Sequence, residues 1–487
     1  MLVDTDKDFE RGNVSKMKFS TVFTIIAISV VYCKNPGLKT RITDAGLTYA
    51  DQVAIGQLSK SAVGQKIPDQ SGKSGDVTYE ISNIVIKSFS VPSSSIDVIA
   101  DGLNWKASGL ELSISGHFHY KLHKFIPISD SGSIDVSVSG VTFDVGISLG
   151  ADSTGRPKIG SNGCSCDIGS VHVKFHGGAA WIYNLFKGLV EKAIKKQLNN
   201  QLCSMIKNAV DVDGSKALAK LKVTVDVGKV FLLDYRFIGK PAFNPQHFLE
   251  TYHKGEFYWA SSISEAPFDP ISMPAFSSTQ KMFYIWMSDY TFNTLTYQAQ
   301  KHGILAYNLT QKDLPAQAKD FLNTTCNGIP CIGKIIPQIG QKYPNNQVQM
   351  FMSSRFAPNM SVAEGKVNVL FGGTITMTTT KGDNFLLALN ATMSISVTLD
   401  VKNQSIYANI GDMSIVLHVI KSDVGQISDI VLNVIANTAI IGFVKPQLNK
   451  LGAKGIPLPL TNNIQFVNTE ITLDKDTIMM GTDLKYQ

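Results

Sequence analysis

The sequence predicts an α+β protein with two similar halves, each combining twisted antiparallel sheet with one long helix. Short segments of alternating apolar and polar residues dominate, and glycine is abundant, with 39 residues in 487; both features suit antiparallel strands. Charged residues make up 17% of the chain, below the roughly 25% typical of soluble domains. The order helix, strands, long helix occurs in residues 34–257 and again in residues 279–487. A repeat of this size indicates duplicated domains and not a solenoid.

Residues 1–33 have the features of a signal peptide. The apolar run TVFTIIAISVVY at 21–32 follows Lys16 and Lys18. About a dozen apolar residues are too few to cross a bilayer but match the core of a signal. Cleavage near Cys33 predicts an exported chain, with Met17 as an alternative start. No later stretch reaches ~18 apolar residues, so we expect a secreted, soluble, extracellular protein.

The first half begins with a helix and continues as strands. Thr43 or Asp44 can cap a helix with an apolar stripe that includes Leu47, Val53 and Leu58, and Pro68 blocks its continuation. Alternation then predicts strands around 79–86, 110–122 and 134–149, with a tight hairpin where the phase shifts at Ser139-Gly140.

The stretch from Cys164 to Cys203 predicts a strand followed by a long amphipathic helix over 179–210. Beyond Gly177 and Gly178 the apolar residues recur at helical spacing: Trp181, Leu185, Leu189, Ile194, Leu198 and Leu202. Cys164–Cys203 is the favoured disulfide, because Cys326 and Cys331 are close enough to pair locally or remain thiols. Cys166 is then unpaired. A disulfide at this position agrees with export, because such bonds persist in oxidising compartments.

The second half follows a stiff linker over 258–278, which contains Pro267, Pro270 and Pro274. We expect helices near 290–302 and 312–322, strands over 347–354, 366–378, 384–399 and 405–420, and a long helix over 424–451. The stripe of the long helix includes Ile427, Val431 and Val434, and Pro446 should kink or end the helix. A twisted sheet around a long helix can enclose an apolar cavity suited to acyl chains. Periodicity alone favours a filled core.

Charge and sequons differ between the halves. The net charge of +6 is concentrated in the first half, which favours anionic partners such as phospholipid head groups. No basic cluster is interleaved with exposed aromatic residues, so nucleic acid is not an expected partner. Five glycosylation sequons follow residue 300 and none occurs between residues 34 and 300, which leaves the first half bare. They are Asn308, Asn323, Asn359, Asn390 and Asn403.

Two further patterns carry possible chemistry. His117, His119 and His123 share a strand face and could bind Zn²⁺, but Lys121 among them opposes a cation. A solvent-facing polar edge is the favoured interpretation, so no metal site is predicted. Ser148 lies in a G-x-S-x-G pattern, yet it ends a strand where a hydrolase needs a strand-to-helix elbow. We therefore expect no catalytic residue and no enzyme.

Motifs along almost the whole mature chain resemble one family. They include NPGLKTRITDAGLTYA at 35–50, FSVPSSSI at 89–96, CSCDIGSVHV at 164–173, WIYNLF at 181–186, MSDYTFNT at 287–294 and IPLPL at 456–460. In this order they resemble bactericidal/permeability-increasing protein and lipopolysaccharide-binding protein, with their plasma lipid-transfer relatives. The resemblance implies a boomerang of two barrels joined by a central sheet, and it carries the family disulfide onto Cys164 and Cys203.

The resemblance also implies sites. One phospholipid-sized pocket per barrel would be lined by residues on the helices: Leu47, Val53, Trp181, Leu185, Leu189, Ile427, Val431 and Val434. Endotoxin would bind at the tip of the first barrel through Lys60, Lys66, Lys73, His117, His119, Lys121 and Lys124. Histidines stand where strongly basic members are dense in lysine. If these histidines bind endotoxin, binding should strengthen as the pH falls through about 6.5.

These expectations define a secreted, monomeric, antibacterial glycoprotein of innate immunity. It would bind lipopolysaccharide at the bacterial outer membrane and hold phospholipid, without any other cofactor. A phospholipid transfer protein is the alternative, and a secreted esterase acting through Ser148 is a more distant one. The sequence does not distinguish killing bacteria from signalling their presence, nor which head group the pockets prefer.

Overall fold

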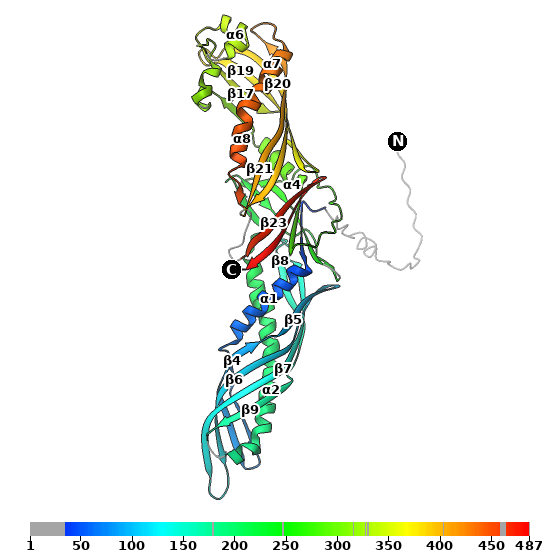
Figure 1. The fold of residues 1–487 in the computed structure, drawn as a ribbon, viewed down its shortest axis with the longest axis vertical. Helices are drawn as coiled ribbons and strands as arrows, with labels where there is room; N and C mark the ends of the chain where they lie inside the picture. Colours follow the sequence, from blue (N-terminus) through cyan, green and yellow to red (C-terminus); the bar gives the residue numbers. More distant parts are fainter. Residues whose placement is uncertain are drawn as a thin grey trace, which may run out of the picture. The chain divides into compact units, whose positions relative to one another are not determined.

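The computed structural model describes residues 35–177, 180–245, 248–314, 316–326, 328, 331–402, 404–457 and 464–486 (Figure 1). The predicted signal peptide lies outside these residues. The fold is α+β, as expected, and its sheets are antiparallel and twisted but not closed, so neither half is a closed barrel.

The first half is dominated by one eight-stranded sheet. Its order is β2-β4-β6-β7-β8, with β3 on β4, β5 on β6 and β9 on β7. The strands are β2 (Lys66–Ile67), β3 (Gln70–Ser74), β4 (Val77–Ser90), β5 (Ser93–Ile99), β6 (Gly102–Leu122), β7 (Ile128–Ala151), β8 (Pro157–Asp167) and β9 (Ser170–His176). Alternation along most of β6 and β7 gives the sheet one buried face and one exposed face.

The buried face of this sheet is covered by helices α1 (Asp44–Ala62) and α2 (Ala180–Asn208). The Thr43 hydroxyl caps α1 by accepting from the backbone N–H of Gly46. Asp51 fastens α1 to the sheet, because its carboxylate accepts from Trp105 Nε1 at 2.9 Å and from the Ser94 hydroxyl at 2.6 Å. The α2 helix continues through a π-helical turn, η1 (Ala209–Gly214), into α3 (Ser215–Ala219).

The predicted stripe of α2 is wrong by one residue over its first turns. Leu185 and Leu189 are exposed, while their neighbours Phe186 and Val190 are buried. The buried residues recur at every fourth position: Ile182, Phe186, Val190, Ile194, Leu198, Leu202 and Ile206. Aromatic packing explains the choice at the start of the helix, since the Phe186 ring stacks on Tyr79 with centroids 5.5 Å apart.

The predicted hairpin at Ser139-Gly140 is also wrong. Strand β7 runs through this dipeptide, and its register against β6 shifts between the pairs Leu110–Val141 and Leu112–Val138. Gly140 has a φ of 65°. Glycine adopts this left-handed conformation at low cost, and β-bulges often place a glycine in it. A phase change in the alternation therefore marks a bulge here and not a turn.

A central six-stranded sheet joins the two halves, as expected. Its order is β12-β13-β1-β15-β24-β23. The strands are β1 (Leu38–Thr43), β12 (Ala242–Asn244), β13 (Phe248–His253), β15 (Phe283–Ser288), β23 (Ile464–Asp474) and β24 (Thr477–Tyr486). The first and last strands of the described chain thus share one sheet. Arg41 on β1 bonds Glu250 on β13 and donates to the carbonyl oxygens of Phe276 and Ser278.

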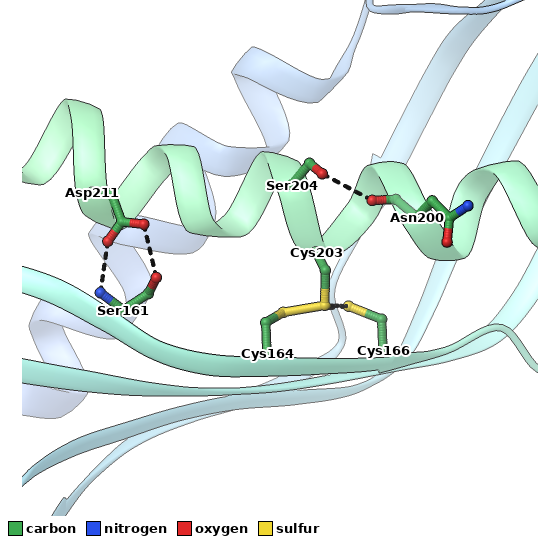
Figure 2. The surroundings of a disulfide bond; sticks show 7 residues. All are labelled: Ser161, Cys164, Cys166, Asn200, Cys203, Ser204 and Asp211. Atoms are coloured by element: carbon green, nitrogen blue, oxygen red, sulfur yellow. Dashed lines mark hydrogen bonds between the residues drawn. A yellow bond between two sulfur atoms is a disulfide. The ribbon is translucent and has the colours of Figure 1, made fainter.

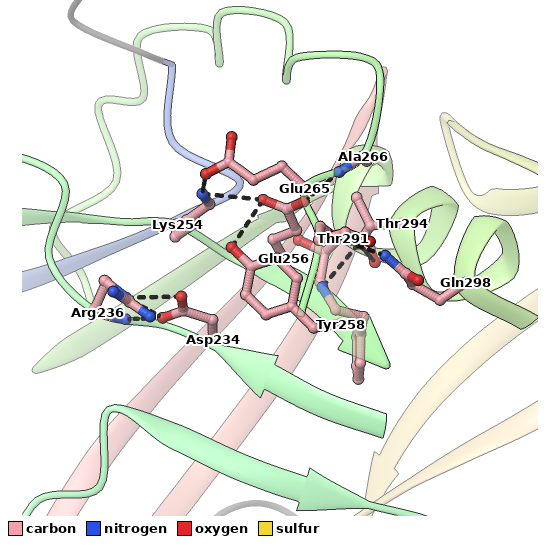
Figure 3. A network of polar contacts seen from close by, with 12 residues as sticks. Asp234, Arg236, Lys254, Glu256, Tyr258, Glu265, Ala266, Thr291, Thr294 and Gln298 are labelled. Carbon is pink, nitrogen blue, oxygen red and sulfur yellow. Dashed lines mark hydrogen bonds and ion pairs between the residues drawn. The ribbon is translucent and has the colours of Figure 1, made fainter. Parts of the chain in front are cut away.

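The segment after β14 is held by a buried polar network (Figure 3). Strands β10 (Thr224–Val227), β11 (Phe231–Asp234) and β14 (Glu256–Trp259) form a small sheet next to helix α4 (Asp289–Lys301). Glu256 accepts from the N–H of Ala266 at 2.7 Å and pairs with Lys254 at 3.3 Å. Gln298 on α4 donates to the Ser264 carbonyl at 3.0 Å. The proline-containing linker is therefore fastened at its start to both halves.

The second half contains a seven-stranded sheet in the order β16-β17-β19-β20-β21-β22, with β18 on β19. The strands are β16 (Ala306–Leu309), β17 (Val348–Ser354), β18 (Asn359–Ala363), β19 (Lys366–Thr379), β20 (Phe385–Lys402), β21 (Ser405–Ser422) and β22 (Ile456–Pro457). Short helices lie between β16 and β17: η2 (Gln311–Asp313), η3 (Ala316–Leu322), α5 (Ile332–Ile335) and α6 (Pro337–Lys342).

The long helix of this half consists of α7 (Asp429–Ala439), the π-helical turn η4 (Ile440–Val444) and α8 (Lys445–Gly452). Pro446 does not end the helix, because the π turn before it adjusts the backbone. Asp429–Gly452 is long and apolar enough to cross a membrane by length and composition, and only 11% of its most apolar window is buried. The sequence predicts this helix over 424–451, but it was not counted among apolar stretches long enough to cross a membrane, because Asn433, Asn437 and Thr438 interrupt its apolar run.

Candidate functional site

One end of the first sheet forms the candidate site, called the tip below. It consists of residues 73–80, from the β3–β4 hairpin, and residues 117–128, from the β6–β7 hairpin. The two hairpins are joined where the N–H of His123 donates to the Asp76 carbonyl at 2.7 Å. His123 Nε2 also lies 3.0 Å from the Thr78 hydroxyl. The two turns are therefore held side by side.

The β6–β7 turn exposes apolar side chains to solvent. Phe125 is fully exposed, Ile126 is 72% exposed and Ile128 is 43% exposed. Contiguous apolar side chains in water mark an interaction site. Sequence reasoning missed them because they fall between two regular strands. The signal was nevertheless present, since Phe-Ile-Pro occupies a turn in which Gly, Asn, Asp or Ser is usual.

Three lysines lie at the same end of the sheet as the exposed apolar residues. Lys73 and Lys121 are both in register with Thr78, on opposite sides of β4. Residues paired in this way point to the same face of a sheet, and two strand spacings separate them by roughly 10 Å. Lys124 is exposed next to Phe125 in the turn itself. The tip thus carries Lys73, Lys121 and Lys124 together with the apolar residues.

Two predicted site lysines lie elsewhere. Lys66 pairs with Val85 on β4, seven residues along the strand from Thr78, which corresponds to roughly 23 Å. Lys60 is in the last turn of α1. Both side chains are exposed, but the structure does not gather them with the lysines of the tip.

Acidic residues partly offset the lysines of the tip. Within residues 73–80 and 117–128, Lys73, Lys121 and Lys124 are accompanied by Asp76 and Glu80. His117 and His119 point outward from β6, and His119 is in register with Glu80 on β4. The lysines of the tip therefore exceed its carboxylates by one, and its imidazoles are additional polar groups on the same exposed face.

The alternative chemistries find little support in the geometry. Among the described residues, the cluster of side chains close enough to share a metal ion is Cys164, Cys166 and Cys203, and the three tip histidines do not form one. Ser148 lies inside strand β7, and its hydroxyl donates to the Gly160 carbonyl at 3.1 Å. It therefore lacks the strand-to-helix elbow that exposes a hydrolase nucleophile.

The disulfide predicted between Cys164 and Cys203 is present (Figure 2). Cys164 on β8 is bonded to Cys203 on α2, so the disulfide fastens the long helix to the sheet. Cys326 is bonded to Cys331, which resolves the alternative left open for this pair. Cys166 is free and partly buried, and burial raises the pKa of its thiol to about 11.

The residues predicted to line the two pockets, one in each half, do not all face the interior of their half. Leu47 is buried in the core, while Leu185, Leu189, Val431 and Val434 are exposed. Val53 and Ile427 are partly buried, and the side chain of Trp181 lies outside the described residues. A cavity of about 10 Å³ beside α2 is lined by other residues, among them Ile86, Phe89 and Leu198. That volume is about enough for one water molecule and far below the volume of ligand sites. The phospholipid pockets stay a prediction.

Four of the five predicted glycosylation sites can be located. Asn308 and Asn359 are exposed on β16 and β18. Asn390 is partly exposed on β20. Asn323 is partly buried, and its amide donates to the Asp320 carboxylate at 3.0 Å. Asn403 lies outside the described residues. Glycosylation at these positions stays a prediction.

Comparison with known proteins matches both halves of the chain. The model of the LBP / BPI / CETP family N-terminal domain matches residues 46–217, and the C-terminal domain model matches residues 225–486. Bactericidal permeability-increasing protein of Sebastes schlegelii is 30% identical over 467 residues, covering 93% of this chain and 96% of that protein. Lipopolysaccharide-binding protein of Homo sapiens is 27% identical over 463 residues, covering 93% and 94%.

A solved structure agrees with these matches. A crystal structure of lipopolysaccharide binding protein aligns with a TM-score of 0.62 and 26% identity, covering 93% of this chain and 99% of that one. The two halves on a shared central sheet thus define a two-domain protein of this architecture. The chain belongs to the LBP / BPI / CETP family.

Proposed function

We propose that this chain is a secreted lipid-binding protein of antibacterial defence that captures lipopolysaccharide through its tip. The observation that carries the proposal is the fully exposed Phe125 in a turn that also carries Lys124, at the end of a sheet whose adjoining strands carry Lys73 and Lys121. An amphiphile with phosphates beside acyl chains matches both parts of this arrangement. Relatives named for binding lipopolysaccharide and for killing bacteria support the same substrate class.

The proposed mechanism has two steps. Lysine ammonium groups attract the phosphates of the glycolipid, and charge-assisted hydrogen bonds then fix the head group. Phe125 and Ile126 next enter the acyl layer, which removes their apolar surface from water. The near balance of charge at the tip predicts modest affinity at neutral pH. Mildly acidic buffer should strengthen binding, because protonated His117, His119 and His123 add cationic partners.

The experiment is a titration of the full-length chain with fluorescent lipopolysaccharide at pH 7.4 and pH 5.5. Phe125→Ser with Ile126→Ser should weaken binding about tenfold, as expected for exposing apolar side chains that the complex buries. Lys121→Gln with Lys124→Gln should weaken it by a similar factor and reduce its salt dependence. Equal affinity at both pH values would remove the histidines from the mechanism.

The matched control is Lys60→Gln with Lys66→Gln, which removes the same charge away from the tip. This variant should bind like the parent chain. If it alone loses binding, the site lies along α1 and β2 and the proposal fails. Vesicle-to-vesicle lipid transfer and hydrolysis of an activated ester, measured on the same samples, separate the phospholipid-transfer and esterase alternatives. Native mass spectrometry of the purified chain tests for bound phospholipid and for the monomeric state.

A further inference from the structure

The long helix of the second half packs on its sheet through polar side chains. Among the described strands, only the short β22 pairs with the outer edge of β21, and α7 and α8 run beside the rest of that edge (Figure 1). Asn433 accepts from the N–H of Leu417 at 2.6 Å and donates to its carbonyl at 2.9 Å. Asn437 repeats this pair of bonds on Ile415 at 3.0 and 2.7 Å. The helix thus satisfies the strand edge as another strand would.

Both ends of the helix extend this contact. The Asp429 carboxylate accepts from the N–H of Val419 at 3.0 Å, and Asn449 on α8 accepts from the N–H of Ile410 at 2.7 Å. The spacing of four between residues 429, 433 and 437 keeps these groups on one face of the helix. The polar contacts to β21 therefore occupy one face of the helix and leave its other faces to apolar side chains.

The face turned away from the core is apolar. Leu432 and Ala436 pack into the hydrophobic cluster of this half. A helix turns about 100° per residue, so Ile430 and Val434 lie nearly opposite those two residues. They are 77% and 64% exposed. The exposed set, called the C-terminal apolar face below, comprises Ile430, Val431, Val434, Ile441, Phe443, Val444 and Leu451.

The adjoining sheet surface has the same character. Val416 and Ile420 on β21 are 61% and 53% exposed. They lie on the same face of β21 as His418. The Nδ1 atom of His418 lies 2.6 Å from the Asp429 carboxylate. This contact places the start of α7 beside the outward face of β21. The apolar surface therefore extends from the helix onto the sheet.

Beyond Asp429, whose carboxylate contacts Val419 and His418, all charged residues of this helix are lysines. Lys445, Lys450 and Lys454 follow the apolar residues, and the sequence contains no Asp or Glu between Ile430 and Thr469. Apolar residues with lysines and no acidic residues are typical of helices that lie in the interface of an anionic bilayer. A second copy of this chain would instead bring like charges together. Free acyl chains would not require the lysines.

We propose that the C-terminal apolar face docks on anionic phospholipid bilayers, as a second membrane contact separate from the tip. The helix would lie in the plane of the interface and would not cross the bilayer, because crossing would break the asparagine bonds to β21. The inference does not depend on endotoxin binding, since it rests on residues 410–454 alone.

The test is co-sedimentation of the full-length chain with phosphatidylcholine vesicles, with and without phosphatidylglycerol. The parent background carries Phe125→Ser and Ile126→Ser, so that the tip does not mask the second contact. Ile430→Ser, Val434→Ser and Phe443→Ser together should lower the apparent affinity about tenfold or more. Lys445→Gln, Lys450→Gln and Lys454→Gln should abolish the preference for phosphatidylglycerol.

The matched control replaces two exposed isoleucines elsewhere, Ile263→Ser and Ile304→Ser, and should bind like its parent. Circular dichroism of each variant checks that the fold is retained. Unchanged vesicle binding by a folded apolar-face variant would overturn the proposal. So would light scattering that shows a dimer in the parent and a monomer in that variant, because the face would then be a self-association surface.

Discussion

The Sγ of Cys166 lies 2.8 Å from the Sγ of Cys203, the atom already bonded to Cys164. The two neighbouring cysteines of β8 therefore share one partner on α2 (Figure 2). Thiol–disulfide exchange needs this kind of proximity. We predict that Cys164→Ser keeps the strand and helix linked through a Cys166–Cys203 disulfide. Peptide mapping without reduction checks this, and two free thiols in the folded variant would contradict it.

Burial should make the free thiol slow to react at neutral pH. The pKa of Cys166 is raised to about 11 by desolvation, so roughly one thiol in several thousand is ionised near pH 7.5. The rate of alkylation should rise about tenfold per pH unit until the pH approaches that pKa. Quenched reactions with iodoacetamide, quantified by mass spectrometry, measure how the alkylation rate depends on pH. Rapid labelling at pH 7 would show that the thiolate is stabilised by a group that the structure does not place there.

The sequence predicted most of this fold because periodicity records which side of an element faces the core. It located the long strands β4, β6, β7, β19, β20 and β21 of the two large sheets, the two long helices and the Cys164–Cys203 link, but not the strands of the central sheet. The prediction failed at Ser139-Gly140, because a bulge and a hairpin produce the same change of phase in the alternation of apolar residues. It also failed at Leu185, because two adjacent stripes along α2 are both apolar. The bulge became visible only through the pairing of β7 with β6.

The candidate site was predicted less completely, because it depends on contacts between strands. Lys121 and Lys73 are far apart in sequence but both flank Thr78. Lys66 is near Lys73 in sequence yet pairs further along β4, and Lys60 lies at the end of α1. Phe125 was missed because alternation says nothing about a turn. The asparagine bonds of α7 were also beyond sequence reasoning, since their partners are backbone groups.

The bonds between α7 and β21 should control the local stability of the second half. Asn433→Ala with Asn437→Ala leaves four backbone groups of β21 without these partners, and each unsatisfied group costs about 1–3 kcal/mol. We expect faster hydrogen exchange over residues 410–445. Thr438→Ala is the control, because its hydroxyl bonds only Val434 within the helix. Equal exchange in both variants would mean that apolar packing holds the helix.

The central sheet should weaken in acid through His253. Burial lowers the pKa of this histidine from 6.5 to about 4. Its Nδ1 lies 2.8 Å from the Tyr235 carbonyl, and its Nε2 lies 2.8 Å from the Thr251 hydroxyl.

Because the unfolded chain binds this proton at higher pH, stability is full above about 6.5 and is lost as the pH falls towards 4. A shift of this size corresponds to about 3 kcal/mol. His253→Gln should flatten the dependence of urea midpoints on pH across this window. The same slope in the variant would assign the acid sensitivity to other groups.

The most direct test of the account is to locate bound lipopolysaccharide on the full-length chain. Hydrogen–deuterium exchange at neutral pH, with and without the glycolipid, measures protection along the sequence. The account predicts new protection in residues 73–80 and 117–128, with the segment around Phe125 most affected, and none around Lys60 and Lys66. Binding that protects other segments and leaves 117–128 unchanged would contradict it.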